Sequence, residues 1–298
     1  KFINAILRKI EKKSFKINYS STNKNLDLVN FSCPKWIVQK IVNEHGLIKA
    51  KNFLKLSLKI PDIWLRVNLI KTDIQSIKNT LNKNSIAFIQ DSYLDFFIKV
   101  EKFDNNGILI GLLNDGYLYA QNPSSGHVVN LMEIASDDHS ILDACASPGG
   151  KSSLIGQIKK NENILVCMDI NKKRIDRLKK NLSTLGLSNI EYLCNNASIY
   201  KSKRIYNKIL LDLPCSSSGT IRKNPDVKWR LSKGQIKKNQ DIQYEILDNM
   251  KDQISVGGEI IYSTCSIFND ENEYNIIKFL NKNKNFNISD IKSIVPLK

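Results

Sequence analysis

Residues 142–153 have the sequence LDACASPGGKSS, in which an apolar strand leads into a glycine-rich turn and then into a predicted helix. Glycines let the backbone approach a ligand closely, and a helix N-terminus offers free amide groups. A P-loop, GxxxxGK[ST], would need glycine at position 145, which is Cys145, and the dinucleotide pattern GxGxxG is also absent. The segment therefore predicts a nucleoside-binding loop of another kind, with a purely structural turn as the alternative.

The C-terminal half of the chain alternates between predicted strands and helices. The strands contain the segments ILDACA, NILVCMD, IEYLCNN, KILLDLP and EIIYSTCS. Helices are predicted after Asp169, with Asn171 and Gly186 as caps, from about 233 to 254, and near 272 to 280. This alternation indicates a parallel sheet covered on both faces. Asp169 ends the second strand about 20 residues after the glycines, where an acid can accept hydrogen bonds from ribose hydroxyls.

The N-terminal half is organised differently. Residues 1–57 carry apolar side chains at helical spacing, and Pro34 marks a helix start with Ser32 as its candidate cap. From 58 to 130, the segments WLRVNLI, SIAFIQ, DFFIKV and GYLYAQ are typical of strands, with a helical pattern between the first two. This mixture predicts a small α+β domain that precedes an α/β domain over residues 131–298.

The composition favours a protein with a conventional core and a polyanionic partner. The chain has 298 residues, more than a usual single domain, so we expect two or three domains. Its hydrophobic content of 42% is enough to bury at least one full core. Its formal net charge is +16, and lysines and arginines attract the phosphates of a nucleic acid whatever the base sequence. We therefore expect a polyanionic partner, with a merely solvated basic surface as the alternative.

The cysteines and the first residues indicate the compartment. The six cysteines form no CxxC pair and no cluster with the three histidines, so we expect neither a metal site nor a disulfide framework. Free thiols indicate a reducing compartment, and we expect the cytoplasm. No apolar segment reaches the roughly 18 residues that span a bilayer, so no membrane association is expected. The chain begins with Lys1, and we expect a fragment trimmed at its N-terminus.

Two cysteines follow neighbouring predicted strands. Cys215 comes after the fourth strand, in DLPCSSSGTIRKNPDVKW, and Cys265 ends the fifth, in YSTCS. Because the carboxyl ends of parallel strands face one crevice, both thiols are expected to face the ligand of the glycine loop. The alternative for either cysteine alone is a buried small apolar group.

Three segments, DACASPGGKS, DLPCSSSGTIRKNPDVKW and YSTCS, resemble in order and spacing the motifs of the RNA cytosine-5 methyltransferase family. PDIWLRVN, GYLYAQNPSS and FINAILRKI are most similar to its bacterial RsmB branch, whose members methylate small-subunit ribosomal RNA. The resemblance implies a Rossmann-like domain that uses S-adenosylmethionine over residues 131–298 and a ferredoxin- or RRM-like domain over residues 58–130. It also implies that residues 1–57 hold the end of a NusB-like helical RNA-binding domain and a linker.

The resemblance further implies roles for single residues. Cys265 would be the nucleophile that adds to C6 of cytosine, and Cys215 would assist removal of the C5 proton and release of the product. Asp212 and Lys151 would contact the base, and Pro214 would shape its pocket. The cofactor would be bound by Cys145, Ala146, Ser147, Pro148, Gly149, Gly150, Lys151, Asp169, Arg174, Asn196 and Asp212.

The chemistry of cytosine explains the need for two thiols and a donor. C5 becomes nucleophilic only after a thiolate adds to C6, and the C5 proton must then leave before that thiolate does. Negative charge that develops on the base needs a donor, which is either a protonated Asp212 or Lys151. Four basic residues are expected to hold phosphates of the unstacked RNA, with a solvated loop as the alternative: Arg222, Lys223, Lys228 and Arg230.

The sequence departs from the family pattern at two points, and several other functions are alternatives to this interpretation. Asn196 occupies a position where the family usually has an acid, and the chain ends at IVPLK without the usual Gly- and Phe-containing strand pair. An amino-group methyltransferase would have [DN]PP[YF] in place of DLPC, and a DNA cytosine-5 enzyme would exchange the roles of the two cysteines. The remaining alternatives are a catalytically weak RNA-binding or ribosome-assembly factor and methylation of transfer RNA.

Overall fold

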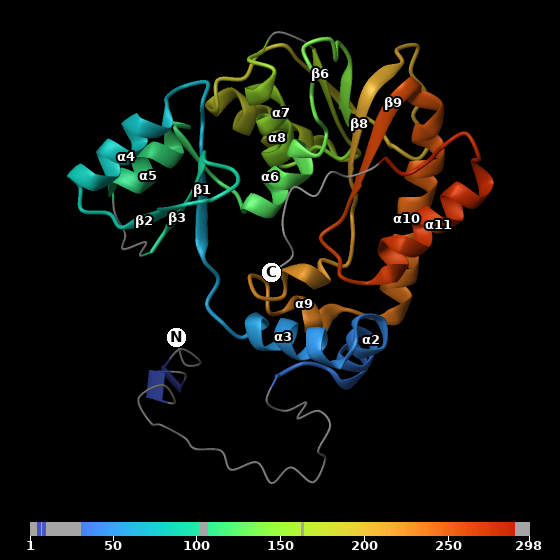
Figure 1. Ribbon diagram of the computed structural model, residues 1–298, viewed down its shortest axis with the longest axis horizontal. Coiled ribbons are helices and arrows are strands. Elements are labelled where there is room, and N and C mark those ends of the chain that lie inside the picture. The colour runs from blue at the N-terminus through green and yellow to red at the C-terminus, as the bar shows by residue number, and fades with distance from the viewer. Residues whose placement is uncertain (1–4, 7, 10–30, 102–106, 162–163, 290–298) are drawn as a thin grey trace.

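The computed structural model describes residues 5–6, 8–9, 31–101, 107–161 and 164–289, and it contains two sheets (Figure 1). One sheet is antiparallel with the strand order β2-β3-β1-β4, and the other has the order β7-β6-β5-β8-β9. All neighbouring strands of the second sheet are parallel. The expected α/β fold with a preceding α+β domain is therefore confirmed.

The antiparallel sheet belongs to the small α+β domain, whose two helices cover one of its faces. Successive side chains of a strand point to opposite faces, so Leu65 and Val67 pack on those helices while Trp64 and Arg66 point the other way. Asp73 caps the first helix by accepting a hydrogen bond from the Ser76 amide. The elements are β1 (Ile63–Val67), α4 (Ile74–Lys83), β2 (Phe88–Gln90), β3 (Phe97–Val100), α5 (Gly107–Asn114) and β4 (Leu118–Ala120).

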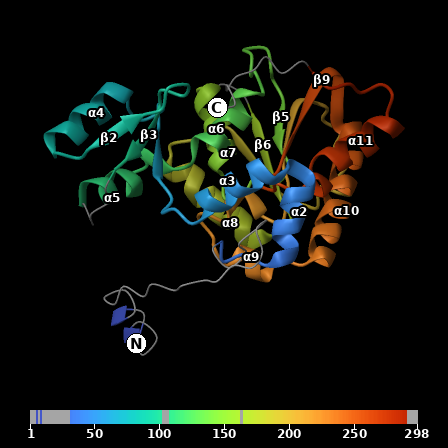
Figure 2. The same cartoon turned by 60° about the horizontal axis from the view of Figure 1, so that its bottom comes forward.

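The parallel sheet is covered by helices on both faces, as Figures 1 and 2 show. Strand β6 explains this arrangement, because Leu165 and Cys167 join the apolar cluster of α7 and α8, whereas Val166 and Met168 join that of α10 and α11. The elements are α6 (Pro123–Asn130), β5 (Ile141–Asp143), α7 (Gly150–Ile158), β6 (Leu165–Asp169), α8 (Lys172–Thr184), β7 (Ile190–Cys194), β8 (Tyr206–Asp212), η1 (Ser218–Thr220), α9 (Val227–Arg230), α10 (Lys233–Met250), η2 (Lys251–Gln253), β9 (Ile254–Ser263), η3 (Asn269–Glu271) and α11 (Glu273–Lys282).

The helix ends follow local sequence signals closely. Asn171 caps α8 by accepting a hydrogen bond from the Arg174 amide at 3.2 Å, and Gly186 follows that helix with a φ of 76°. The helix expected to run to about residue 254 ends earlier, at Met250, because Ile254 already begins β9. The carboxyl ends of the parallel strands thus meet at one edge of the sheet.

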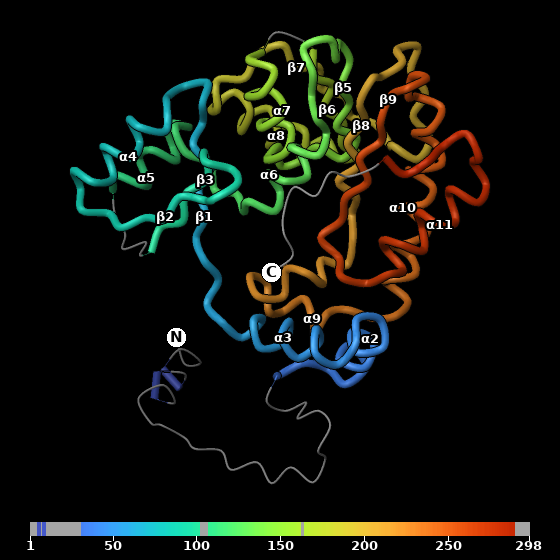
Figure 3. The backbone as a smooth tube through the Cα atoms, viewed as in Figure 1, coloured from blue at the N-terminus to red at the C-terminus, as the bar shows by residue number. Residues whose placement is uncertain are grey.

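Two N-terminal helices, α2 (Lys35–His45) and α3 (Leu47–Ser57), pack against the parallel-sheet domain. They share an apolar cluster with Ile236 of α10 and Phe268 of the loop after β9, and a linker continues from α3 into β1 (Figure 3). The expected Ser32 cap is wrong, because Pro34 has extended backbone angles and directly precedes the helix without a capping hydrogen bond. Much of FINAILRKI lies outside the described residues, and the expected NusB-like remnant is not confirmed. Within the described ranges, no helix is long and apolar enough to cross a membrane.

Candidate active site

The thiols of Cys215 and Cys265 meet at the carboxyl ends of two adjacent strands. Asp212 and Ser263, the last residues of β8 and β9, are register partners, and each cysteine follows its strand closely. The two Sγ atoms lie 2.9 Å apart. This approach agrees with the crevice expected from the strand order, and it lets both sulfur atoms act on one ligand.

The close contact shifts the pKa values of the two thiols in opposite directions. A hydrogen bond from Cys215 lowers the pKa of Cys265 to about 6, while burial opposes this shift. Ser217 assists, since its Oγ lies 3.4 Å from the Cys265 sulfur. The same hydrogen bond, together with burial, raises the pKa of Cys215. At neutral pH Cys265 is therefore the thiolate, and Cys215 keeps the shared proton.

A cluster of small residues holds together the loops that carry the two cysteines. The hydroxyl oxygen of Ser216 lies 3.1 Å from those of Ser218 and Ser266. The Gly219 amide donates to the Cys265 carbonyl, and a Cβ at Gly219 would lie only 2.8 Å from that oxygen. Sequence reasoning missed these residues, although the SSSG segment directly after the first cysteine was an available signal.

A buried carboxylate, Glu271, fixes the backbone next to Cys215. Its Oε1 accepts hydrogen bonds from the Ser216 amide at 2.7 Å and from the side-chain amides of Asn239 and Gln243 at 3.2 Å. Glu271 comes from the segment after β9 and Ser216 from the loop after β8, so the carboxylate ties the two cysteine loops together. A single sequence gives no local pattern that marks such a residue.

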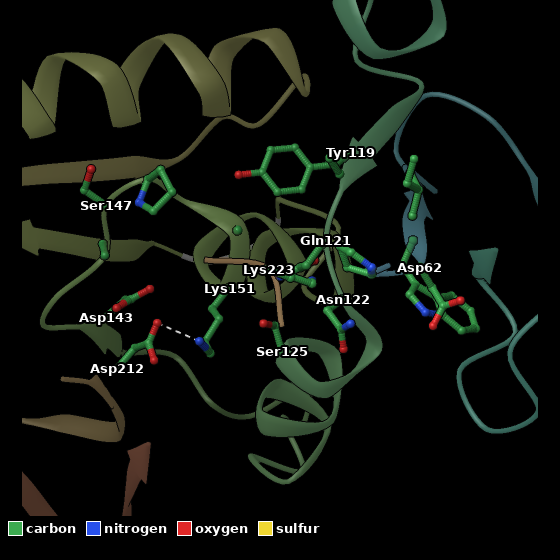
Figure 4. A pocket seen from close by; sticks show the side chains of 17 residues that line it. Asp62, Tyr119, Gln121, Asn122, Ser125, Asp143, Ser147, Lys151, Asp212 and Lys223 are labelled. Atoms are coloured by element: carbon green, nitrogen blue, oxygen red, sulfur yellow. Dashed lines mark ion pairs between the residues drawn. The ribbon is translucent and has the colours of Figure 1, made fainter. Parts of the chain in front are cut away.

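Lys151 and Asp212 form an ion pair close to the thiols. Lys151 Nζ lies 2.6 Å from Asp212 Oδ2, and both charges act on the Cys265 thiol (Figure 4). Asp143, which sequence reasoning did not single out, is buried beside them and accepts a hydrogen bond from the Ser152 hydroxyl at 2.6 Å. Burial raises the pKa of Asp143 to about 7. These three charged residues line a cavity of about 470 Å³, together with Ala146, Ser147, Pro148 and Gly150 of the glycine loop.

The glycine loop and Asp169 converge at the ends of β5 and β6, where the cofactor was expected. Arg174 pairs with Asp169 Oδ2 at 3.2 Å and donates to the Ser147 carbonyl at 3.0 Å. Gly149 has a φ of 104°, and a Cβ there would come within 2.7 Å of Leu178, so a side chain does not fit. The Asp169 carboxylate keeps free lone pairs, since a carboxylate accepts up to about four hydrogen bonds. These residues fit the nucleoside part of S-adenosylmethionine.

Two of the expected cofactor residues use their side chains elsewhere. The Cys145 side chain is partly buried against the apolar core of the sheet, and burial raises its pKa, so its thiol stays protonated at neutral pH. Asn196 follows β7, and its Oδ1 accepts hydrogen bonds from the amide and hydroxyl of Ser198, both at 3.0 Å. Asn196 can therefore offer a ligand its Nδ2 donor, where a carboxylate would offer acceptors.

The four basic residues after Cys215 do not form one free surface. Arg222 pairs with Asp62 at 3.1 Å and so ties this loop to the segment before β1. Lys228 is buried, and Arg230 pairs within its own helix turn at 2.6 Å. Lys223 is exposed and lines the same cavity as Lys151. The expectation that all four hold phosphates is therefore wrong for Lys228, and for the other three residues it stays a prediction.

No metal-binding group is present among the described residues, in which no cluster of His, Cys, Asp or Glu side chains could hold an ion. The site thus consists of a thiol pair, an ion pair and a glycine-rich loop at one edge of the sheet. Such a site can add a thiolate to an electron-poor ring and move a proton nearby.

Comparison with known proteins gives matches along most of the chain. The family model for 16S rRNA methyltransferase RsmB/F matches residues 129–297. The model for the ferredoxin-like domain of RsmF/B-like methyltransferases matches residues 33–105. Among solved structures, the crystal structure of PH0851 is similar with a TM-score of 0.82 and 26% identity, covering 94% of this chain and 64% of that one.

Curated relatives support the same similarity. A probable ribosomal RNA small subunit methyltransferase B from Coxiella burnetii is 31% identical over 267 residues, which cover 87% of this chain and 61% of the relative. The ribosomal RNA small subunit methyltransferase B of Proteus mirabilis is 30% identical over 287 residues, which cover 93% of this chain and 65% of the relative. The chain therefore spans less than two thirds of the length of these relatives.

Proposed function

The chain belongs to the 16S rRNA methyltransferase RsmB/F family, and we propose that it methylates carbon 5 of a cytosine in structured RNA, with 16S ribosomal RNA as the substrate. The family uses S-adenosylmethionine, in agreement with the cofactor expected from the sequence. One observation carries the proposal, namely the 2.9 Å contact between Cys215 and Cys265 with Cys265 as the more acidic thiol. Methyl transfer to oxygen or nitrogen needs no such pair, because those atoms are nucleophilic without prior addition of a thiolate.

Cys265 acts as the nucleophile. Its lowered pKa keeps it ionised at neutral pH, so it can add to C6 of the target base without a separate general base. The addition makes C5 electron-rich and able to attack the sulfonium methyl group that S-adenosylmethionine supplies. The lowered pKa of Cys265 and the raised pKa of Cys215 support the assignment of Cys265 as the nucleophile.

Cys215 assists the second half of the reaction. Its pKa is raised first of all by the hydrogen bond to Cys265, and that hydrogen bond is lost once the Cys265 sulfur is bonded to carbon. The pKa of Cys215 then falls, so Cys215 can release its proton to solvent and accept the proton from C5. Loss of the C5 proton restores the ring double bond and expels the Cys265 thiolate, which frees the product.

Lys151 and Asp212 bind the polar edge of the target base. Their 2.6 Å ion pair supports an ammonium group as the donor that stabilises negative charge on the ring during attack. Asp212 in its ionised form can accept a hydrogen bond from the exocyclic amine of cytosine. Of the two donors considered from the sequence, the pair thus favours Lys151.

The residues at the ends of β5 and β6 hold the cofactor. Asp169 accepts hydrogen bonds from the ribose, and Arg174 fixes the Asp169 carboxylate and the Ser147 carbonyl relative to each other. The glycine loop brings the backbone of residues 145 to 150 against the ligand. Asn196 contributes a donor near the base of the nucleoside.

Bisulfite sequencing tests the proposal. Unmethylated 16S ribosomal RNA that is incubated with the chain and S-adenosylmethionine should gain a bisulfite-resistant cytosine, and Cys265→Ala should abolish this product. Cys194→Ala, which removes an exposed thiol outside the pair, should remain as active as the unaltered chain. Transfer RNA is treated in parallel. Methylation of transfer RNA alone would replace the proposed substrate, and methylation by Cys265→Ala would refute the proposed nucleophile.

A further inference from the structure

The uncovered face of the antiparallel sheet points toward the parallel-sheet domain. In the small domain, Leu65 of β1 and Leu118 of β4 belong to the core under α4 and α5. Arg66 and Tyr119 are register partners on these same two strands. Because side chains alternate along a strand, Arg66, Tyr119 and Trp64 project from the opposite face, away from those helices.

A buried arginine fixes this face against the glycine loop. Arg66 is only 1% exposed, and its guanidinium donates to the Gly150 carbonyl at 2.9 Å and to the Ser153 hydroxyl at 2.6 Å. It also donates to the Gln121 side chain at 2.7 Å. The sheet face and the first turn of α7 are thus held at a set separation, and the space left between them is the cavity next to Lys151.

One wall of this cavity is formed by β1 and β4 of the small domain together with the start of α6. The cavity has a volume of about 470 Å³, which lies in the range of ligand pockets, roughly 300 to 1,000 Å³. Lys151 and Asp212 stand on one side, and Figure 4 shows Asn122 and Ser125 across from Lys151, with the Tyr119 hydroxyl directed toward the loop of Ser147. The residues on this wall and at the rim are Trp64 and Tyr119 of the small domain, Asn122 and Ser125 at the start of α6, and Lys223.

Several of these groups have polar capacity that the protein does not use. Asn122 Oδ1 accepts from the amide and hydroxyl of Ser124, whereas its Nδ2 has no hydrogen-bond partner among the described residues. Lys223 forms no ion pair within the described part of the chain, because Asp62 is taken by Arg222. The wall therefore combines aromatic rings, an unused amide donor and an unpaired cation.

We infer that the side of this cavity opposite Lys151 and Asp212 binds a nucleotide adjacent to the target cytosine, an inference that rests on the proposed function. Single-stranded RNA bases are recognised by stacking on aromatic side chains of an open sheet and by hydrogen bonds to their edges. Trp64 and Tyr119 stack or flank the neighbouring base, Asn122 and Ser125 contact its edge, and Lys223 pairs with its phosphate. The small domain and the start of α6 thus select the sequence context of methylation.

The test uses RNA fragments that lack one base next to the methylated cytosine, which is first located by bisulfite sequencing. At one of the two flanks, removal of the base should lower kcat/KM of the unaltered chain roughly tenfold, the scale of one lost stacked base. In Trp64→Ala, removal of the same base should lower kcat/KM by much less, because the aromatic ring on which the base stacks is already absent. Trp64→Phe, which keeps an aromatic ring, should respond nearly as the unaltered chain does. Lys223→Gln should raise KM for RNA several-fold with little change in kcat.

Matched variants and a cofactor measurement separate the outcomes. Tyr274→Ala and Lys83→Gln remove an exposed ring and an exposed cation from other helices and should leave kcat/KM unchanged. Calorimetry without RNA should give the same S-adenosylmethionine affinity for Trp64→Ala and the unaltered chain. The inference is wrong if the missing base affects the unaltered chain and Trp64→Ala equally at both flanks, or if Trp64→Ala loses cofactor affinity. Either result leaves the proposed function standing. RNA that the unaltered chain neither binds nor methylates would overturn the proposed function as well.

Discussion

Single residues set the charges in the thiol pair, and the acidity of Cys265 depends chiefly on one neighbour. Cys215 donates the hydrogen bond that contributes most to the lowered pKa of Cys265, and Ser217 contributes less. Burial alone would raise the pKa, so the ionised state exists because a donor is present. The roles of the two cysteines are thus linked through one shared proton.

Replacement of Cys215 should therefore change the titration of Cys265. In Cys215→Ala the thiolate loses its main donor, and the pKa of Cys265 should rise from about 6 toward its ordinary value of 9.0. Fewer molecules then carry the thiolate at neutral pH, so alkylation of Cys265 by iodoacetamide should slow by up to about tenfold for each pKa unit gained. Mass spectrometry of the labelled peptide across a pH series measures this rate, with Cys194→Ala as the control. An unchanged midpoint would show that Cys215 does not set the acidity of Cys265.

Among the elements, the loops after β8 and β9 behave as one unit. The serine cluster, Glu271 and the bond from Gly219 to the Cys265 carbonyl all connect one loop to the other. The strands place the two cysteines near each other, and these connections fix the sulfur atoms within contact distance. The close packing of the two loops requires these hydrogen bonds and also a residue without a side chain at position 219, which is Gly219.

Gly219→Ala should separate the loops. Its Cβ would lie 2.8 Å from the Cys265 carbonyl oxygen, so the backbone must move, at a cost of roughly 1 to 3 kcal/mol. The methylation rate should fall strongly while the melting temperature falls only modestly, because the change acts directly on the distance between the two thiols. Gly234→Ala is the matched control, since a Cβ there meets no atom within 4 Å, and it should be neutral or slightly stabilising. Thermal unfolding and initial rates compare the two variants, and equal behaviour would contradict a coupled pair of loops.

Local patterns predicted the elements and part of the site, for reasons that are visible in the structure. The strands of the parallel sheet are continuous apolar segments, and parallel strand ends share an edge, so the meeting of Cys215 and Cys265 could be expected. The bond from Ser216 to Glu271 joins positions 55 residues apart, and the bond from Arg66 to Ser153 joins positions 87 residues apart. Such contacts depend on how domains and loops dock, and no period or spacing in one sequence indicates them.

In the whole molecule, Arg66 joins the small domain to the cofactor loop. Burial lowers the pKa of this guanidinium to about 10, so it remains charged at neutral pH although its hydrogen-bond acceptors are all neutral. Three hydrogen bonds compensate in part for its removal from water, since its buried Nε has no partner among the described residues. The two domains are therefore coupled through a charge that neither domain could bury alone.

Removal of this charge should affect both domains at once. Arg66→Met loses the bonds to Gly150, Ser153 and Gln121, so the melting temperature should fall by several degrees and S-adenosylmethionine should bind more weakly, each bond contributing about 1 kcal/mol or more. Arg204→Gln, which removes an exposed ion pair with Glu191, should change neither. Calorimetry of unfolding and of cofactor binding gives both values. A stability loss without any change in cofactor affinity would show that Arg66 supports only the fold.

The covalent adduct that each cysteine variant forms with RNA distinguishes the roles of the two thiols. Cys215→Ala should still attack and methylate the cytosine but fail to release it, because the nearby base for the C5 proton is missing. A denaturing gel of each variant, incubated with substrate RNA and S-adenosylmethionine, keeps covalent adducts and removes ordinary complexes. We predict a slow-migrating RNA-bound band with Cys215→Ala and none with Cys265→Ala. A stable band with Cys265→Ala and none with Cys215→Ala would contradict the assignment of Cys265 as the nucleophile.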